Sequence, residues 1–219
     1  MAEIHKNDSP ESFAQLIDVS RETLDKLIVY VELLNKWQRR INLVGPKTLP
    51  EVWRRHFLDS AQVYTYIDNS TGPLIDLGSG AGFPGLVLSI MGIPNITLVE
   101  SNQKKCSFLG EVIRQADCDA QVFKGRIKDY PHKKLAETIT ARALAPLEDL
   151  LTWSYPLLSE GGKCLFLKGE THEQELTAAK KRWTMDVQIH PSKADNTNSR
   201  DESATGALLE IGKLTPRDG

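Results

Sequence analysis

A glycine-rich segment, LIDLGSGAGFPGL at residues 74–86, restricts the fold of this chain more than any other stretch. A short apolar run ends at Gly78, further glycines follow, and Phe83-Pro84-Gly85 stands where a helix is expected to open. Glycine permits positive φ angles and a close approach of the backbone to a ligand, and proline is tolerated in a first helical turn. The segment therefore predicts a strand, a tight turn and a helix, with a ligand at the carboxyl end of the strand.

Two classes of cofactor bind at such a turn, and two acidic residues favour one of them. Gly80-x-Gly82-x-x-Gly85 matches the dinucleotide fingerprint, in which the helix N-terminus faces a pyrophosphate. Asp76 precedes the glycines, where a carboxylate would repel a pyrophosphate but suits a ligand that carries an amino group and a sulfonium. Glu100 ends the next predicted strand and can accept hydrogen bonds from both hydroxyls of a ribose. The pattern favours S-adenosyl-L-methionine over NAD, and a turn without a ligand is the remaining alternative.

The chain after Gly72 alternates between short apolar runs and helical segments. The runs expected to be strands are 74–77, 96–100, 120–123, 137–141 and 163–167. This alternation predicts βαβ units with helices on both faces of a parallel sheet. Two later runs, Met185–His190 and Ala207–Gly212, have no helical pattern between them and predict a C-terminal antiparallel hairpin. The expected fold class is a Rossmann-like α/β sheet.

The residues before the sheet predict a helical extension packed on its core. Apolar residues recur at three- and four-residue steps within 12–40, which predicts one helix. Thr48 and Glu51 stand at the spacing of a capping box, which predicts a second helix that runs to about Asp68. We expect residues 1–71 to form this extension and residues 72–219 to form the cofactor-binding domain.

The composition is that of a globular protein, with 40% hydrophobic and 26% charged residues among 219. No apolar run approaches the roughly 18 residues that cross a bilayer, and the N-terminus lacks the pattern of a secretory signal. Three cysteines lie far apart, which predicts reduced thiols, no metal site and a cytoplasmic protein. The net charge of −2 leaves nucleic acid possible, because phosphate binding needs only a local basic patch.

Five motifs in register resemble those of one bacterial family. DLGSGAGFPG, with its Phe-Pro-Gly, resembles the cofactor motif of the glucose-inhibited division protein B family, also called ribosomal RNA small subunit methyltransferase G. Upstream, NLVGPKTLPEVWRRHFLDS (42–60) resembles the helix that precedes this motif. Downstream, GRIKDY (125–130), ITARALAPL (139–147) and LFLKG (165–169) follow in the expected order. The resemblance covers nearly the whole chain.

The resemblance implies a class I methyltransferase that transfers a methyl group from S-adenosyl-L-methionine to N7 of one guanine in 16S ribosomal RNA, conventionally position 527. The partner is then the RNA itself or a precursor of the small subunit. Where this chain has Lys128 the family commonly has an acid, so we expect a backbone N–H contact there. With the acids and glycines above, the expected cofactor-binding residues are Asp76, Gly78, Gly80, Phe83, Glu100, Ile127, Lys128 and Arg142.

Methylation of guanine N7 requires no dedicated base. N7 carries no proton, so positioning supplies most of the catalysis. In agreement, Thr140-Ala141-Arg142-Ala143 differs from the Asn/Asp-Pro-Pro-aromatic tetrapeptide of amino-group methylation. At strand ends, Arg142 and Lys168 are candidates for positioning the substrate, or else are surface cations. His56 and Asp59, three residues apart, form either part of a polar site cluster or a hydrogen-bonded pair at a helix end.

Basic clusters are candidates for RNA binding. They are Lys36/Arg39/Arg40, Arg54/Arg55, Lys104/Lys105, Lys133/Lys134 and Lys180/Lys181/Arg182. We favour the first two, which flank the helical extension beside the expected crevice, and we expect a monomer.

Two other functions stay open: methylation of a small molecule or protein on the same fold, and a non-enzymatic module that senses the cofactor.

Overall fold

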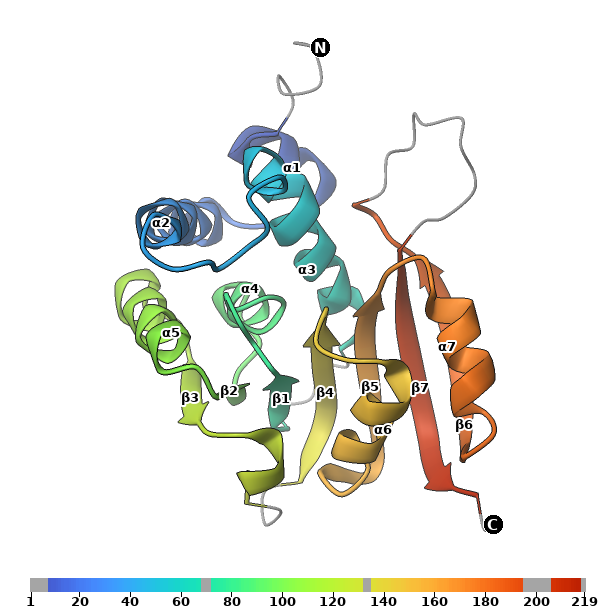
Figure 1. Cartoon of the computed structure of the whole chain (residues 1–219). Coiled ribbons are helices and arrows are strands. Elements are labelled where there is room, and N and C mark those ends of the chain that lie inside the picture. The colour runs from blue at the N-terminus through green and yellow to red at the C-terminus, as the bar shows by residue number, and fades with distance from the viewer. Residues whose placement is uncertain (1–7, 68–71, 132–134, 195–205, 218–219) are drawn as a thin grey trace.

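A computed structural model describes residues 8–67, 72–131, 135–194 and 206–217 of the chain. Seven strands form one sheet in the order β3-β2-β1-β4-β5-β7-β6 (Figure 1). The strands are β1 (Leu74–Leu77), β2 (Ile96–Glu100), β3 (Ala120–Lys124), β4 (Ala136–Arg142), β5 (Leu158–Lys168), β6 (Trp183–Pro191) and β7 (Ala207–Pro216). Strands β1 to β5 pair in parallel, and β7 is antiparallel to both β5 and β6. The predicted Rossmann-like sheet with a C-terminal hairpin is confirmed.

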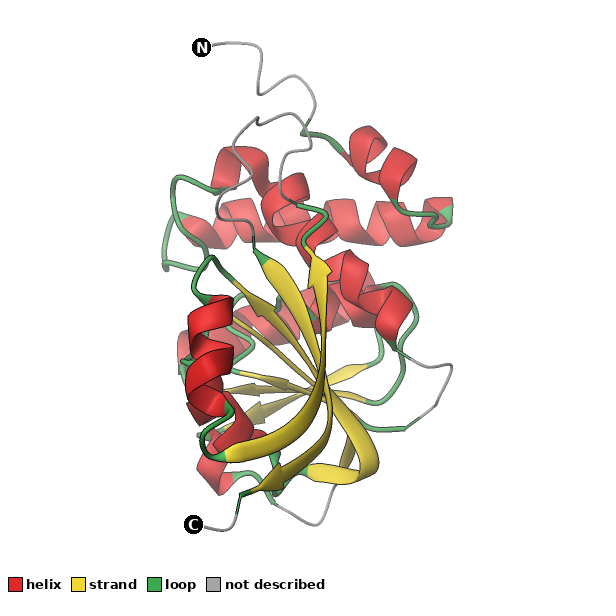
Figure 2. Ribbon diagram, turned by 90° about the vertical axis from the view of Figure 1, so that its right-hand side faces the viewer, coloured by secondary structure: helices red, strands yellow, loops and turns green. Residues whose placement is uncertain are grey.

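Alternate side chains of the central strands face two separate hydrophobic clusters. Leu74 and Leu98 belong to one cluster, and Ile75 and Val99 belong to the other. Helices α4 (Gly85–Ile90) and α5 (Gln103–Ala116) supply residues to the first cluster, and α6 (Leu147–Ser154) and α7 (His172–Ala179) supply the second. Figure 2 shows helices on both sides of the twisted sheet. Because both faces are buried, most side chains of β1 and β2 are apolar.

The first predicted helix is two helices, α1 (Pro10–Leu16) and α2 (Arg21–Gln38). The prediction of one continuous helix is wrong because Ile17 has an extended backbone and Ser20 starts a new helix. The Ser20 hydroxyl oxygen accepts a hydrogen bond from the Thr23 N–H at 3.1 Å, which is the usual N-cap bond. An apolar stripe continues across such a break, so periodicity alone does not reveal it.

The second predicted helix is a series of short helical turns. A 3₁₀ turn (Leu49–Glu51), a π-helical turn (Trp53–Leu58), α3 (Asp59–Ala61) and a 3₁₀ turn (Gln62–Tyr66) follow one another. The predicted capping box is wrong, because the Thr48 side chain makes no capping bond and Glu51 forms an ion pair with Arg54 instead. The predicted end near Asp68 lies outside the described residues.

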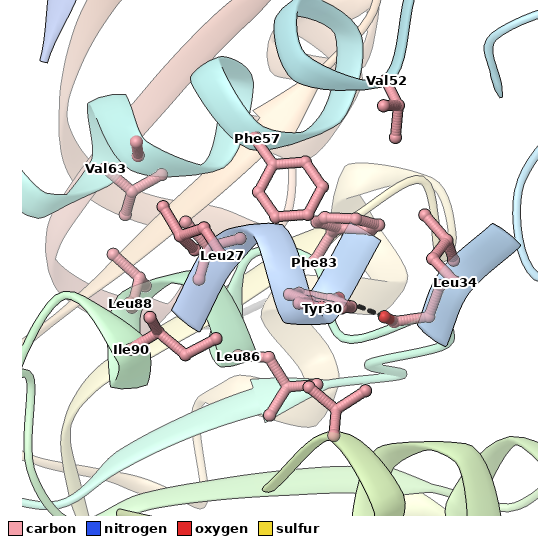
Figure 3. Packing of buried hydrophobic residues seen from close by; sticks show 14 of the residues in the cluster. Leu27, Tyr30, Leu34, Val52, Phe57, Val63, Phe83, Leu86, Leu88 and Ile90 are labelled. Atoms are coloured by element: carbon pink, nitrogen blue, oxygen red, sulfur yellow. Dashed lines mark hydrogen bonds between the residues drawn. The ribbon is translucent and has the colours of Figure 1, made fainter. Parts of the chain in front are cut away.

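The helical extension packs on the glycine turn through Tyr30 of α2. The Tyr30 hydroxyl is buried and donates a hydrogen bond to the Ala81 carbonyl (Figure 3). The Tyr30 ring lies 5.0 Å from the Phe57 ring and 5.3 Å from the Phe83 ring, measured between centroids. A Cβ atom on Gly82 would lie 2.7 Å from the Tyr30 hydroxyl, so this packing requires glycine. Described residues on both sides of Gly72 therefore share one hydrophobic cluster, and the division into two domains stays a prediction.

Replacing Tyr30→Phe is expected to lower the free energy of unfolding by about 1–2 kcal/mol, because the buried Ala81 carbonyl loses its donor. Urea denaturation followed by circular dichroism measures the change. Tyr155 is 42% exposed, so Tyr155→Phe is the matched control, with an expected change within about 0.5 kcal/mol. Equal losses in the two variants would contradict the assigned role of the Tyr30 hydroxyl.

Candidate active site

A cavity of about 740 Å³ opens at the carboxyl ends of β1, β2, β3 and β4. Its volume lies within the range of small-molecule and cofactor sites. The predicted cofactor-binding residues that line it are Gly78, Gly80, Phe83, Glu100, Ile127, Lys128 and Arg142. Residues from four strand ends and from the 3₁₀ turn Ile127–Asp129 therefore meet in one place, and Asp76 does not line the cavity.

The glycine turn needs its glycines for two physical reasons. Gly78, Gly80 and Gly82 have φ angles of 61°, 58° and 93°, a region that side chains disfavour. A Cβ atom on Gly78 would in addition clash with the Leu144 side chain across the cavity wall. The peptide between Phe83 and Pro84 is cis. Pro84 lies one residue earlier than expected, at the N-cap of α4.

Glu100 holds the glycine turn against the end of β2. Its Oε2 accepts a hydrogen bond from the Gly80 N–H at 2.9 Å, and its Oε1 accepts one from the Asn102 N–H at 2.7 Å. The side chain is buried but lines the cavity. Each carboxylate oxygen can accept a second hydrogen bond, so contact with ribose hydroxyls stays a prediction that this geometry permits.

Asp76 lies beneath the glycine turn and is fully buried. The Thr140 hydroxyl donates to its Oδ1 at 2.8 Å, and Oδ2 has no hydrogen-bond partner. A Cβ atom on Gly85 would lie 2.8 Å from Oδ2, which shows how closely the start of α4 covers the carboxylate. Burial raises the pKa of Asp76 to about 6. Asp76 does not line the cavity, and its predicted contact with the cofactor stays a prediction.

Asp76 is expected to make the protein less stable as the pH rises. Its pKa is about 6 in the folded protein against 3.8 ordinarily, so the folded state binds this proton more tightly than the unfolded state does. The free energy of unfolding should then fall by on the order of 3 kcal/mol between about pH 4 and pH 6, and stay level above that.

The Asp76→Asn variant removes this contribution, because an amide does not titrate in this range. Urea denaturation of both proteins at about pH 4.5 and pH 7.5 isolates the effect from that of other titrating groups. A difference between wild type and variant that is the same at both pH values would contradict the assignment.

Arg142 joins the end of β4 to the helical extension. Its guanidinium donates to the Arg55 carbonyl at 3.0 Å, to Asp59 Oδ2 at 3.1 Å and to His56 Nδ1. It also lies 5.0 Å from the centroid of the Phe83 ring, a cation–π contact. The side chain is only 15% exposed. Arg142 is therefore no surface cation, and it connects His56 and Asp59, the two residues that the sequence suggested as a polar cluster.

His56 is held as a neutral imidazole in one tautomer. Burial, together with the positive charges of Arg142 and Arg55, lowers its pKa to about 3. Arginine only donates hydrogen bonds, so Nδ1 accepts from Arg142 and the ring hydrogen lies on Nε2, which donates to Thr48 Oγ1 at 2.7 Å. The Thr48 hydroxyl donates in turn to the Gly45 carbonyl at 2.9 Å. This chain of hydrogen bonds fixes Gly45, a residue of the cavity wall, to the end of β4.

Lys168, at the end of β5, lies outside the cofactor cavity. Its Nζ is 2.7 Å from Glu175 Oε2 and donates to the Ala145 carbonyl at 2.9 Å. The side chain is 10% exposed, so it is no solvated surface lysine. It lines a neighbouring hollow instead, and its role in positioning the substrate stays a prediction.

Several residues of the cavity wall were missed by sequence reasoning. Leu43, Val44 and Gly45 reach the cavity from the loop after α2, and no local pattern announces this. Arg126 also lines the cavity. It follows Gly125 at the carboxyl end of β3. A position at the carboxyl end of a predicted parallel strand could have identified Arg126 as a cavity residue.

The predicted basic clusters differ in their position relative to the cavity and in their ion pairs. Lys105 of the Lys104/Lys105 pair lines the cavity. In the two favoured clusters, acidic neighbours pair with cations, in the contacts Lys36–Glu111, Arg54–Glu51 and Arg55–Glu51. Arg182 pairs with Glu148, and Lys133/Lys134 lie outside the described residues. Lys105, Arg126 and Lys128 on the cavity wall form no ion pair among the described residues.

Within the parts of the chain that the structure describes, no helix is long and apolar enough to cross a membrane. Across the same residues, no group of three or more His, Cys, Asp or Glu side chains could hold a metal ion. Cys106, Cys118 and Cys164 form no disulfide among the described residues.

Comparison with known proteins gives consistent matches. Residues 23–201 match the family model described as rRNA small subunit methyltransferase G. The chain is 52% identical over 186 residues to the ribosomal RNA small subunit methyltransferase G of Paramagnetospirillum magneticum, a match that covers 85% of this chain and 90% of the relative. It is 45% identical over 206 residues to that of Rhodospirillum rubrum, covering 94% and 98%.

Solved structures match the fold at low sequence identity. A glycopeptide N-methyltransferase in complex with (S)-adenosyl-L-methionine aligns with a TM-score of 0.57 at 11% identity, covering 71% of this chain and 93% of that one. A protein of Agrobacterium tumefaciens described as a predicted O-methyltransferase aligns with a TM-score of 0.55 at 16% identity, covering 71% and 79%. These similarities support the methyltransferase fold.

Proposed function

Since this chain belongs to the rRNA small subunit methyltransferase G family, we propose that it transfers a methyl group from S-adenosyl-L-methionine to N7 of a guanine in 16S ribosomal RNA. The observation that carries the choice of N7 is the absence, among the described cavity residues, of a side chain poised to remove a proton. Both ring nitrogens of His56 are engaged in hydrogen bonds and its pKa is about 3. Both oxygens of Glu100 hold backbone N–H groups. Such a site suits an acceptor atom that has no proton to lose.

The cavity suggests how the cofactor lies. Glu100, at the end of β2, suits the ribose, and backbone N–H groups of Ile127 or Lys128 suit the edge of the adenine. The methionine part then lies between Gly78 and Arg142. When bound, the cofactor supplies an electrophilic methyl group on a sulfonium. Asp76, buried beneath the turn, would interact with that positive charge only through space.

The protein's own contribution is positioning, because displacement at the methyl group needs an in-line approach of the acceptor atom. The target guanine has to leave its stack to reach the cavity, as bases do in other base-modifying enzymes. Lys105, Arg126 and Lys128 on the rim are suited to bind RNA phosphates. We further propose that the protein acts as a monomer in the cytoplasm and without a metal.

The test is a methylation assay with purified protein, labelled S-adenosyl-L-methionine, and 16S RNA or small subunits from cells that lack this activity. We expect one labelled guanine, methylated at N7, and mapping of the labelled nucleotide identifies it. Cofactor binding without label in RNA would instead favour methylation of a small molecule or protein. Tighter binding of NAD than of S-adenosyl-L-methionine would contradict the cofactor assignment.

A further inference from the structure

A second hollow, of about 450 Å³, adjoins the cofactor cavity at the carboxyl ends of β4 and β5. His56, Arg142 and Ala143 line both spaces and form the boundary between them. Polar and charged side chains make up most of the remaining wall, including Arg55 and Lys168. A polar hollow of this size suits a hydrogen-bonding ligand better than an apolar one.

The position of the hollow matches the methyl end of the cofactor. In the sheet order β3-β2-β1-β4-β5, the proposed adenosine contacts lie at β2 and β3, and the proposed methionine contacts lie at β1 and β4. The next strand is β5, whose end at Lys168 borders the hollow. An acceptor in the hollow would therefore face the methyl group across the boundary at Arg142.

Most charged groups in the hollow already have partners within the protein. Asp59 accepts hydrogen bonds from Arg142, Gln62 and Ser192. Glu175 accepts from Lys168, Thr171 and the Leu147 N–H.

Glu170 differs from these carboxylates, because its side chain has no hydrogen bond or ion pair among the described residues. It is exposed and stands two residues beyond Lys168, at the carboxyl end of β5. A carboxylate with both oxygens unoccupied accepts two parallel N–H bonds from a planar donor pair.

We propose that this hollow binds the displaced target guanosine and that the Glu170 carboxylate accepts hydrogen bonds from the base N1–H and 2-amino groups. The proposal rests on the proposed function and adds the site that selects the base. In guanine, N7 and the 2-amino group lie on opposite edges. A base held at its N1–H and 2-amino groups by Glu170 therefore presents N7 to the boundary at Arg142, where the methyl group arrives.

The experiment compares guanosine with inosine at the target position of 16S RNA, built by ligating RNA fragments. Inosine keeps N7 and N1–H but lacks the 2-amino group. For the wild-type protein we expect kcat/KM to be roughly tenfold lower on the inosine RNA, since a lost hydrogen bond to a charged group has about that effect. In Glu170→Gln the preference for guanosine should shrink to about twofold, with a higher KM for RNA and an unchanged Kd for S-adenosyl-L-methionine.

Glu173→Gln is the matched control, because Glu173 is an exposed acid in α7 that does not line the hollow. This variant should keep the tenfold preference. If Glu170→Gln keeps the wild-type ratio of kcat/KM on the guanosine RNA to kcat/KM on the inosine RNA, the proposal is overturned. The proposed function still holds in that case, because the wild-type protein methylates the guanosine RNA at N7. A wild-type protein that methylates neither RNA at N7 would overturn the proposed function, and the proposal with it.

Discussion

Gly78→Val is expected to weaken the binding of S-adenosyl-L-methionine by roughly 100-fold or more. The φ angle of Gly78 is 61°, where a β-branched residue is strained by about 1–3 kcal/mol. Its Cβ atom would also clash with Leu144, which lines the same cavity. Relief of either conflict moves the turn or pushes Leu144 into the cofactor space. Isothermal titration calorimetry with S-adenosyl-L-methionine measures the loss.

Gly92→Ala separates the site effect from general backbone strain. Gly92 also has a positive φ angle, 102°, but a Cβ atom there meets no atom within 4 Å. Gly92 does not line the cavity. The control should lose stability by about 1 kcal/mol and keep its cofactor affinity. An unchanged affinity in Gly78→Val would contradict the assignment of the glycine turn to cofactor binding.

Arg142→Ala is expected to lower kcat/KM for methyl transfer by about 100-fold. Catalysis at this site depends on the positions of the reacting groups, and a shift of about 1 Å in such groups has an effect of this size. The guanidinium holds the Arg55 carbonyl, Asp59 and His56, and it packs on Phe83. Its loss removes the guanidinium beside Asp59 Oδ2 and the hydrogen-bond donor to His56 Nδ1. We therefore also expect a loss of about 2 kcal/mol in the free energy of unfolding.

Two further variants test this interpretation of Arg142. Arg142→Lys keeps the charge but cannot reach three acceptors with a planar fork, so it should restore little of the activity. Arg182→Ala removes an arginine whose ion pair with Glu148 is largely exposed, and such pairs contribute about 0–1 kcal/mol. Turnover in a folded Arg142→Ala protein within twofold of the wild type would contradict a positioning role.

The strand pattern was predictable because it depends on local physics. β1 and β2 are short runs of mostly apolar residues that are buried on both faces, and such runs are visible in the sequence. The helical extension was less predictable. A break such as the one at Ser20 depends on one hydrogen bond, and the mixed turns of 49–66 depend on contacts with Arg142 and Phe83.

The candidate site also contains residues whose position could be predicted from the sequence and residues whose position could not. Gly78 and Glu100 were identified from the sequence, because a glycine turn and the end of the following strand are adjacent in any parallel βαβ unit. Asp76 was placed correctly on β1, but sequence spacing does not reveal whether a strand-end carboxylate faces a cavity or the core. The packing of Gly85 and Thr140 around it decides that it faces the core.

The glycine turn, the parallel strands around it and the closing hairpin could be predicted from the order of the residues, since these elements follow from backbone angles and from the alternation of neighbouring side chains. Three other properties required the folded molecule: His56 is neutral, the helical extension holds Arg142, and Glu170 borders a second hollow. These properties arise between segments far apart in the chain. Burial and hydrogen-bond partners at such contacts are set by the packing of the whole molecule, and no local pattern of residues encodes them.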